Sequence, residues 1–106
     1  MKEPLSLFLK SITDSRDFQN KVRDLLDSNK YKADEWASYF LSIRPNEIQE
    51  SHWWILFQEI TSRNIITGCS NKFQIKLANV IVEYFSTLVS TDTYYSKHIE
   101  KYSCYL

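Results

Sequence analysis

Glycine, proline and cysteine are scarce in this chain: its 106 residues include one glycine, two prolines and two cysteines. The single glycine, Gly68, excludes glycine-rich phosphate-binding loops and the G-x-S-x-G turn of serine hydrolases, because these motifs need several glycines. With so few turn formers, the connections must be short and built from serine, asparagine and aspartate. Such connections suit linked helices better than a sheet with many tight turns.

An excess of charge of one sign is also lacking, since 13 basic residues balance 13 acidic ones. This balance argues against a strongly basic nucleic-acid or membrane-surface binder. Cys69 and Cys104 are far apart, and the chain has no C-x-x-C pair of the kind that holds a metal. We expect two free thiols in a reducing cytoplasm.

Targeting and membrane signals are missing as well. Glu3 and Pro4 stand where a secretory signal needs basic residues, and Glu59 and Glu83 interrupt the longest apolar stretches before they reach membrane-spanning length. We therefore expect a single helical domain over residues 1–106, located in the cytoplasm and without a membrane segment.

Apolar residues recur at helical spacing along most of the chain. The pattern predicts a short helix after Pro4, a second capped by Asp14 or Ser15 and ending at Ser28-Asn29, and a third that stops near Pro45. A fourth helix begins at a Ser51 cap, a long fifth follows a Ser70 cap, and a last one begins near Ser90 or Thr91. The apolar faces of the second to fifth helices are, in order, Phe18/Val22/Leu25/Leu26; Ala33/Trp36/Ala37/Phe40/Leu41; Trp53/Leu56/Phe57/Ile60; and Phe73/Leu77/Val80/Tyr84/Leu88.

The most apolar segment is the run from Trp53 to Phe57, in which five consecutive side chains are large and apolar. One helix face cannot hold all five, so we expect the fourth and fifth helices to form a central hairpin that turns at Gly68, with Gly68 in the left-handed conformation. The predicted fold is an all-α bundle of five to six helices. The alternative is an α+β fold with a small hairpin near 63–77, because Phe73-Gln74-Ile75-Lys76-Leu77 also alternates like a strand.

The sequence contains no group of residues with the spacing of a known catalytic or metal-binding motif. His52 and His98 are the only histidines, and neither has a third ligand or an H-E-x-x-H context. Cys69 precedes the fifth helix, where a thiolate is stabilised, but no base accompanies it in sequence. We expect no enzyme, no cofactor and no bound metal.

Acidic residues close to aromatic ones are the best candidates for a binding surface. Acids flanking exposed aromatic rings are typical of a surface that binds a basic protein. The aromatic rings would come from the exposed part of the tryptophan run and from the tyrosines near the end of the chain. A second copy of the chain, forming a homodimer, is an alternative partner. The candidate partner-binding residues are Asp34, Glu35, Glu47, Glu50, Trp54 and Tyr94.

A small nucleic-acid-binding regulator is the alternative function. The second and third helices would form a helix-turn-helix whose basic side chains contact phosphates. These side chains are Lys21, Arg23, Lys30 and Lys32.

The element Asp92-Thr93-Tyr94-Tyr95 resembles the acid-then-Tyr-Tyr element of colicin-DNase immunity proteins. Ser96 replaces the proline that follows in that family, and the element lies at the other end of the chain. In size, helical pattern and aromatics beside acids, the chain resembles small cytosolic immunity proteins of bacterial toxins, including the contact-dependent inhibition type. This resemblance implies a protein that neutralises a nuclease-like toxin by covering it.

Overall fold

The computed structural model describes residues 4–43, 50–88 and 93–106 of the chain. Within these ranges the regular elements are all helical, and no strand is present. The elements are α1 (Leu5–Leu9), α2 (Ser15–Asp27), α3 (Ala33–Ser42), α4 (Glu50–Ser62), the 3-10 helix η1 (Ile65–Gly68), α5 (Asn71–Leu88) and α6 (Thr93–Ser103). The all-α prediction is confirmed, and the alternative hairpin near 63–77 is wrong, because η1 and α5 occupy that segment.

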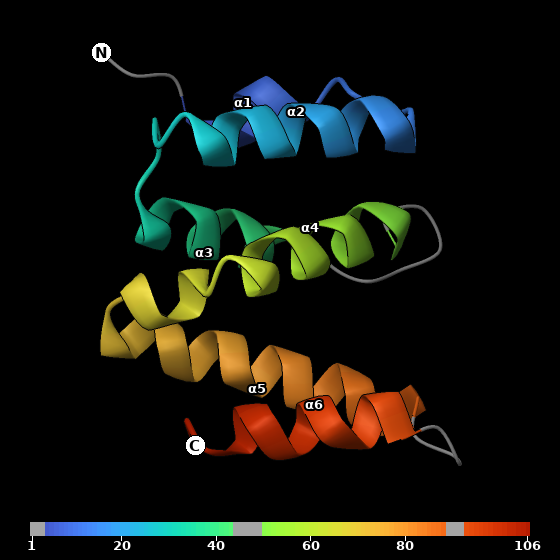
Figure 1. Ribbon diagram of the computed structural model, residues 1–106, viewed down its shortest axis with the longest axis vertical. Helices are drawn as coiled ribbons and strands as arrows, with labels where there is room; N and C mark the ends of the chain where they lie inside the picture. Colours follow the sequence, from blue (N-terminus) through green and yellow to red (C-terminus); the bar gives the residue numbers. More distant parts are fainter. Residues whose placement is uncertain (1–3, 44–49, 89–92) are drawn as a thin grey trace.

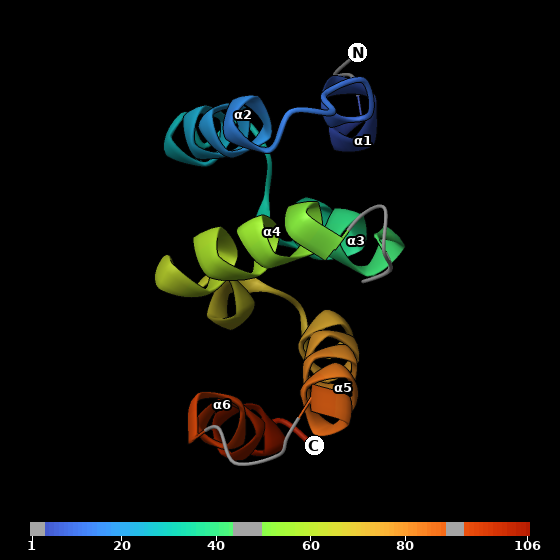
Figure 2. The same cartoon turned by 90° about the vertical axis from the view of Figure 1, so that its right-hand side faces the viewer.

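The helices lie in three layers of two: α1 beside α2, α3 beside α4, and α5 beside α6 (Figures 1 and 2). Helix α2 packs on α4, α1 on α3, and α3 on α5, so the middle layer is covered on both sides. This arrangement places the most apolar helices where neighbours above and below remove their side chains from water.

The predicted apolar faces of α2, α3 and α4 form most of the core, whereas on α5 only Leu77 of the predicted face is buried, together with Ala78, Ile81 and Phe85. Phe18 and Val22 of α2, Trp36 and Phe40 of α3, and Trp53 of α4 are each at most 1% exposed. Burying large rings from several helices in one cluster supplies the main favourable free energy of folding.

The predicted central hairpin of α4 and α5 is borne out only in part. The two helices meet through their side chains, but the central layer pairs α4 with α3, and α5 lies in an outer layer beside α6. The Cα atoms of α4 and α5 all stay more than 8 Å apart. Aromatic rings fill the space between them, with ring centroids 5.1 Å apart for Phe57 and Phe85 and 4.6 Å apart for Trp53 and Tyr84.

The expected helix boundaries hold in part. Asp14 caps α2 by accepting a hydrogen bond from the Arg16 N–H at 3.0 Å, as predicted. Helix α4 begins at Glu50, so Ser51 lies within its first turn and does not act as the cap. The predicted start of the last helix at Ser90 or Thr91 lies outside the described residues.

Candidate functional site

Three of the six predicted partner-binding residues gather at one end of the molecule. Glu50 begins α4, Trp54 lies one turn later on the same helix face, and Tyr94 lies in the first turn of α6. Figure 1 shows the start of α4, the end of α5 and the start of α6 on the same side of the molecule. The three residues therefore belong to one surface.

The other three predicted residues do not join this surface. Asp34 and Glu35 lie in the first turn of α3, at the opposite end of the layers in Figure 1. Asp34 accepts a hydrogen bond from the Ser70 N–H at 2.8 Å, which ties α3 to the segment just before α5. Glu47 lies outside the described residues.

Two residues that were not predicted as partner-binding complete the surface. The hydroxyl of Tyr84 on α5 donates to Glu50 Oε1 at 3.1 Å, and Tyr95 on α6 lies 6.2 Å from the Trp54 ring. Both belong to apolar patterns that read as core from the sequence. We call the half-buried or exposed group Glu50, Trp54, Tyr84, Tyr94 and Tyr95 the aromatic face.

Packing holds the rings of the aromatic face in place. Trp54 stacks on Phe85 at 5.4 Å, and Tyr84 lies 5.9 Å from Trp54. Burial, followed by the hydrogen bond to Glu50, raises the pKa of Tyr84, so its hydroxyl stays protonated and keeps donating. Rigid, partly exposed aromatics lose little entropy on binding a partner.

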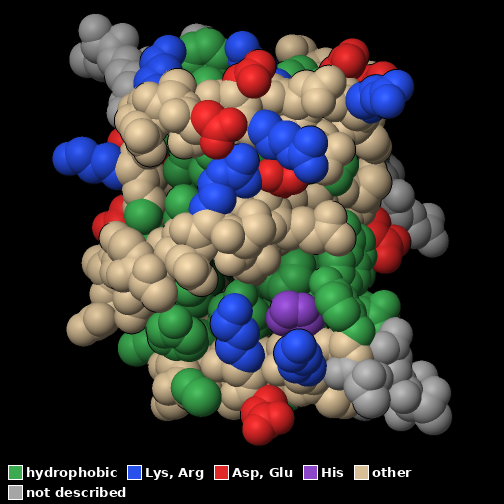
Figure 3. Space-filling model, viewed as in Figure 1, with side chains coloured by type: hydrophobic (Ala, Val, Ile, Leu, Met, Phe, Trp, Pro, Cys, Tyr) green, Lys and Arg blue, Asp and Glu red, His purple; other side chains and the backbone are tan. Residues whose placement is uncertain are grey.

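Charge is uneven around the aromatic face. Glu50 is an exposed carboxylate at one edge, whereas Lys97 and Lys101 lie on α6 beyond Tyr94. In Figure 3, hydrophobic side chains gather between the levels of α4 and α6, and charged side chains gather over α2. The face is therefore mainly apolar, with its carboxylate at the α4 end.

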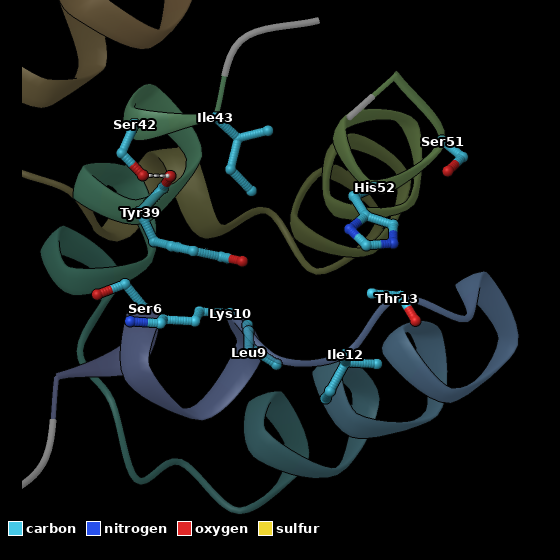
Figure 4. A pocket seen from close by; sticks show the side chains of 10 residues that line it. All are labelled: Ser6, Leu9, Lys10, Ile12, Thr13, Tyr39, Ser42, Ile43, Ser51 and His52. Atoms are coloured by element: carbon cyan, nitrogen blue, oxygen red, sulfur yellow. Dashed lines mark hydrogen bonds between the residues drawn. The ribbon is translucent and has the colours of Figure 1, made fainter. Parts of the chain in front are cut away.

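A separate cleft of about 390 Å³ lies where α1, α3 and α4 meet (Figure 4). Tyr39 reaches into it from α3 and His52 from α4, while Lys10 lines it just after the end of α1. Burial raises the pKa of Tyr39 to about 12, so this phenol is neutral at pH 7. The His52 ring stacks on Phe18 at 4.0 Å and packs against the core.

The lining of this cleft gives no sign of catalysis. Its described residues include no carboxylate and no cysteine, and no hydrogen bond joins Tyr39 to His52. General acid–base or nucleophilic chemistry needs such a partner within hydrogen-bond reach. The described lining therefore offers no pair of side chains arranged for either kind of chemistry.

The remaining candidate for chemistry, Cys69, is a buried thiol. Its Sγ lies 3.5 Å from the Ala33 carbonyl oxygen and 3.4 Å from that of Ile65. Burial, and then the charge of Asp34, raise the pKa of this thiol to about 11. The thiol therefore stays protonated at neutral pH, and the thiolate that the start of a helix can stabilise does not form.

Three of the four basic residues predicted to contact phosphates have partners within the chain. Arg23 Nε donates to Glu59 Oε1 at 2.9 Å, and Lys30 Nζ lies 4.4 Å from the centre of the Phe8 ring. Side chains held in this way are less suited to a phosphate contact than freely exposed ones.

Within residues 4–43, 50–88 and 93–106, no three metal-ligating side chains come together, and no helix is long and apolar enough to cross a bilayer. Comparisons of the chain with models of protein families, with curated proteins and with solved structures give no match in any of the three.

Proposed function

We propose that this chain is a protein-binding inhibitor of the immunity-protein or antitoxin kind, which neutralises a nuclease-like toxin by covering it. The observation that carries the proposal is the aromatic face, where Glu50 is held by Tyr84 one helical turn from the half-buried Trp54. Such a surface needs no chemistry of its own, because covering a substrate-binding site is enough to inhibit.

The position of the charges indicates how a partner docks. The second oxygen of Glu50 has no hydrogen bond from Tyr84, so it can accept one from an arginine or lysine of the partner. The exposed flank of Trp54 offers a ring over which the same cation can lie. Lys97 and Lys101 would repel a cation at the α6 edge, so we place the partner's basic residues at the α4 end.

The test is inhibition of a nuclease toxin encoded next to this chain, measured with the purified proteins at equal concentrations. We expect wild type to abolish cleavage, Glu50→Lys to weaken binding about tenfold and slow association, and Trp54→Ala to weaken it about 30-fold, as for a central aromatic anchor. Tyr84→Phe leaves the carboxylate without its donor and should cost about 1 kcal/mol of binding.

A matched control is Asp24→Lys, which reverses an exposed acid on α2, outside the aromatic face. It should inhibit like wild type. Equal binding by the Glu50→Lys and Asp24→Lys variants at low salt would refute the assignment of the face. A direct gel shift of DNA or RNA that weakens steeply with salt would instead support the nucleic-acid alternative.

A further inference from the structure

His98 occupies the junction of three helices. It lies on α6, where its half-buried ring meets Phe57 of α4 at 5.3 Å and Phe85 of α5 at 5.6 Å. Tyr94, one turn earlier on α6, packs edge-on against it at 4.6 Å. The imidazole is thus part of the contact that docks α6 on α4 and α5, and it supports a ring of the aromatic face directly.

One ring nitrogen of His98 lacks a hydrogen-bond partner. Nδ1 is buried and has no hydrogen-bond partner among the described residues. A neutral imidazole can leave one nitrogen as an unused acceptor, whereas an imidazolium carries a proton on both nitrogens. Protonation therefore either places an unpaired N–H in an apolar contact or requires the contact to open.

The charges around His98 oppose protonation. From α6, Lys101 and Lys97 are the charged groups that act on it, and the rings of Tyr102 and Tyr94 pack against it. From α4 and α5, the contacts are the rings of Phe57 and Phe85, and none of these groups is a carboxylate. Burial, then Lys101 and then Lys97, lower the pKa of His98.

We propose that His98 makes the docking of α6 depend on pH, so that its protonation releases α6 and removes Tyr94 and Tyr95 from the aromatic face. The consequence for a partner rests on the proposed function, but the docking step is a property of the chain alone. Mild acid would then switch the binding surface off without unfolding the other two layers.

The linkage between protonation and docking determines in which direction pH changes the docking of α6. A histidine whose pKa is lower in the docked state than its ordinary value of about 6.5 favours docking fully above that value, and this contribution is lost as the pH falls below it. Each unit of lowering corresponds to about a tenfold change in the docking equilibrium. The ordinary pKa of a carboxyl group lies about two units below that of histidine, so an effect of histidine protonation is separable from that of carboxyl protonation.

The test uses the full chain and two NMR measurements. The first follows the Cε1 protons of His98 and His52 from pH 8 to pH 5. The second compares amide hydrogen exchange of residues 94–103 at pH 7.5 and pH 5.5, corrected for the intrinsic exchange rate. We expect His98 to titrate below about 6.5 and the α6 amides to lose about tenfold of their protection at the lower pH.

The variant His98→Phe keeps a ring in the contact but cannot be protonated, so its α6 protection should be equal at the two pH values. His52→Asn removes the other histidine, and in this variant the loss should persist. A wild-type His98 pKa above about 6.5, as rings that stabilise the cation would produce, overturns the proposal even if His98→Phe fails to fold. Equal loss of protection in wild type and His98→Phe also overturns it.

Failure here is distinguishable from failure of the proposed function. Protection of α6 that does not change with pH rejects the switch, whatever the chain binds. Inhibition of a toxin that is unaffected by Glu50→Lys at pH 7.5 rejects the binding surface, whatever α6 does in acid.

Discussion

Glu59 is a buried charged side chain in the contact between α2 and α4, with its side chain 8% exposed. Its Oε1 accepts from Arg23 Nε at 2.9 Å, and its Oε2 accepts from Arg63 Nη1 at 2.7 Å. Arg63 also reaches Asp27 of α2 at 3.1 Å. Burial alone would raise the pKa of Glu59, but the hydrogen bonds from Arg63 and Arg23 outweigh it and lower the pKa.

Glu59→Gln should lower the free energy of unfolding at pH 7 by about 1–3 kcal/mol, because both guanidinium groups lose a charged acceptor at a buried contact. Urea unfolding followed by tryptophan fluorescence measures this. Glu83→Gln, at an exposed position on α5, is the matched control and should change stability by less than about 0.5 kcal/mol.

The lowered pKa of Glu59 also predicts how the stability of the fold responds to acid. A carboxyl group whose folded-state pKa is lowered stabilises the fold above its unfolded pKa of about 4.3, and this contribution disappears as the pH falls further. Wild type should therefore lose stability more steeply than Glu59→Gln below about pH 4.3. Parallel acid profiles for the two proteins would contradict the assigned role of Glu59.

At the scale of elements, an asparagine and not the glycine makes the unusual turn after α4. Asn64 adopts φ 53°, ψ 39°, in the left-handed region, and Asn29 after α2 has φ 54°. Gly68 does not have a positive φ, so the expected left-handed glycine is wrong. Gly68 instead ends η1, where a Cβ atom built on it would lie 3.4 Å from Ala33 Cβ, so small residues let η1 approach α3.

We predict that Asn64→Ala destabilises the chain by about 1 kcal/mol, because alanine tolerates the left-handed region poorly. Asn64→Gly should be close to neutral, since glycine adopts this conformation without steric cost. The hydrogen bonds at this position use the backbone, from Asn64 N–H to Thr61 and from Thr67 N–H to Asn64, so both variants keep them. Equal thermal unfolding midpoints for the two variants would argue against the conformational explanation.

For the whole molecule, Trp53 connects the middle layer to the α5–α6 layer. Its indole is fully buried, and it lies 5.2 Å from Phe40 of α3, 4.6 Å from Tyr84 and 6.1 Å from Phe85. Trp54, the next residue, is only half-buried, and its ring packs on Phe85 of α5 and Tyr95 of α6. The two neighbouring tryptophans should therefore contribute differently to the stability of the fold.

Trp53→Ala should lower the free energy of unfolding by about 3–5 kcal/mol, the usual cost of removing a fully buried large aromatic ring. This is a large part of the 5–15 kcal/mol that stabilises a typical domain, so partial unfolding near 37 °C is expected. Trp54→Ala should cost about 2 kcal/mol or less, because only part of its area is removed from water. Chemical denaturation of both variants measures the difference, and equal losses would contradict this division of roles.

Much of the fold is predictable from the chain because helices are local. The 3.6-residue spacing of Phe18, Val22 and Leu25 on α2, or of Trp53 and Phe57 on α4, reports which face is buried without knowledge of its neighbour. The same holds for the Asp14 cap, whose partner is only two residues away. The wide α4–α5 pair was not predictable, since it depends on rings that lie between helices.

The candidate surface was only partly predictable. Glu50, Trp54 and Tyr94 were identified by residue type, but Asp34 has the same type and bonds the Ser70 N–H at the other end of the layers. Tyr84 was missed because a tyrosine in an apolar stripe reads as core, and its contact with Glu50 joins residues 34 positions apart.

Some properties of this protein therefore follow from the sequence alone, and others only from the tertiary structure. The order of residues is sufficient for the all-α class and the buried faces of α2, α3 and α4, because these depend on periodicity and on contacts within a few positions. The stacking of the three layers was needed to show which acids face aromatic rings, that Glu59 and Cys69 are buried, and that His98 lies between α4, α5 and α6. These properties arise from contacts between distant segments, whose desolvation and charge no local pattern records.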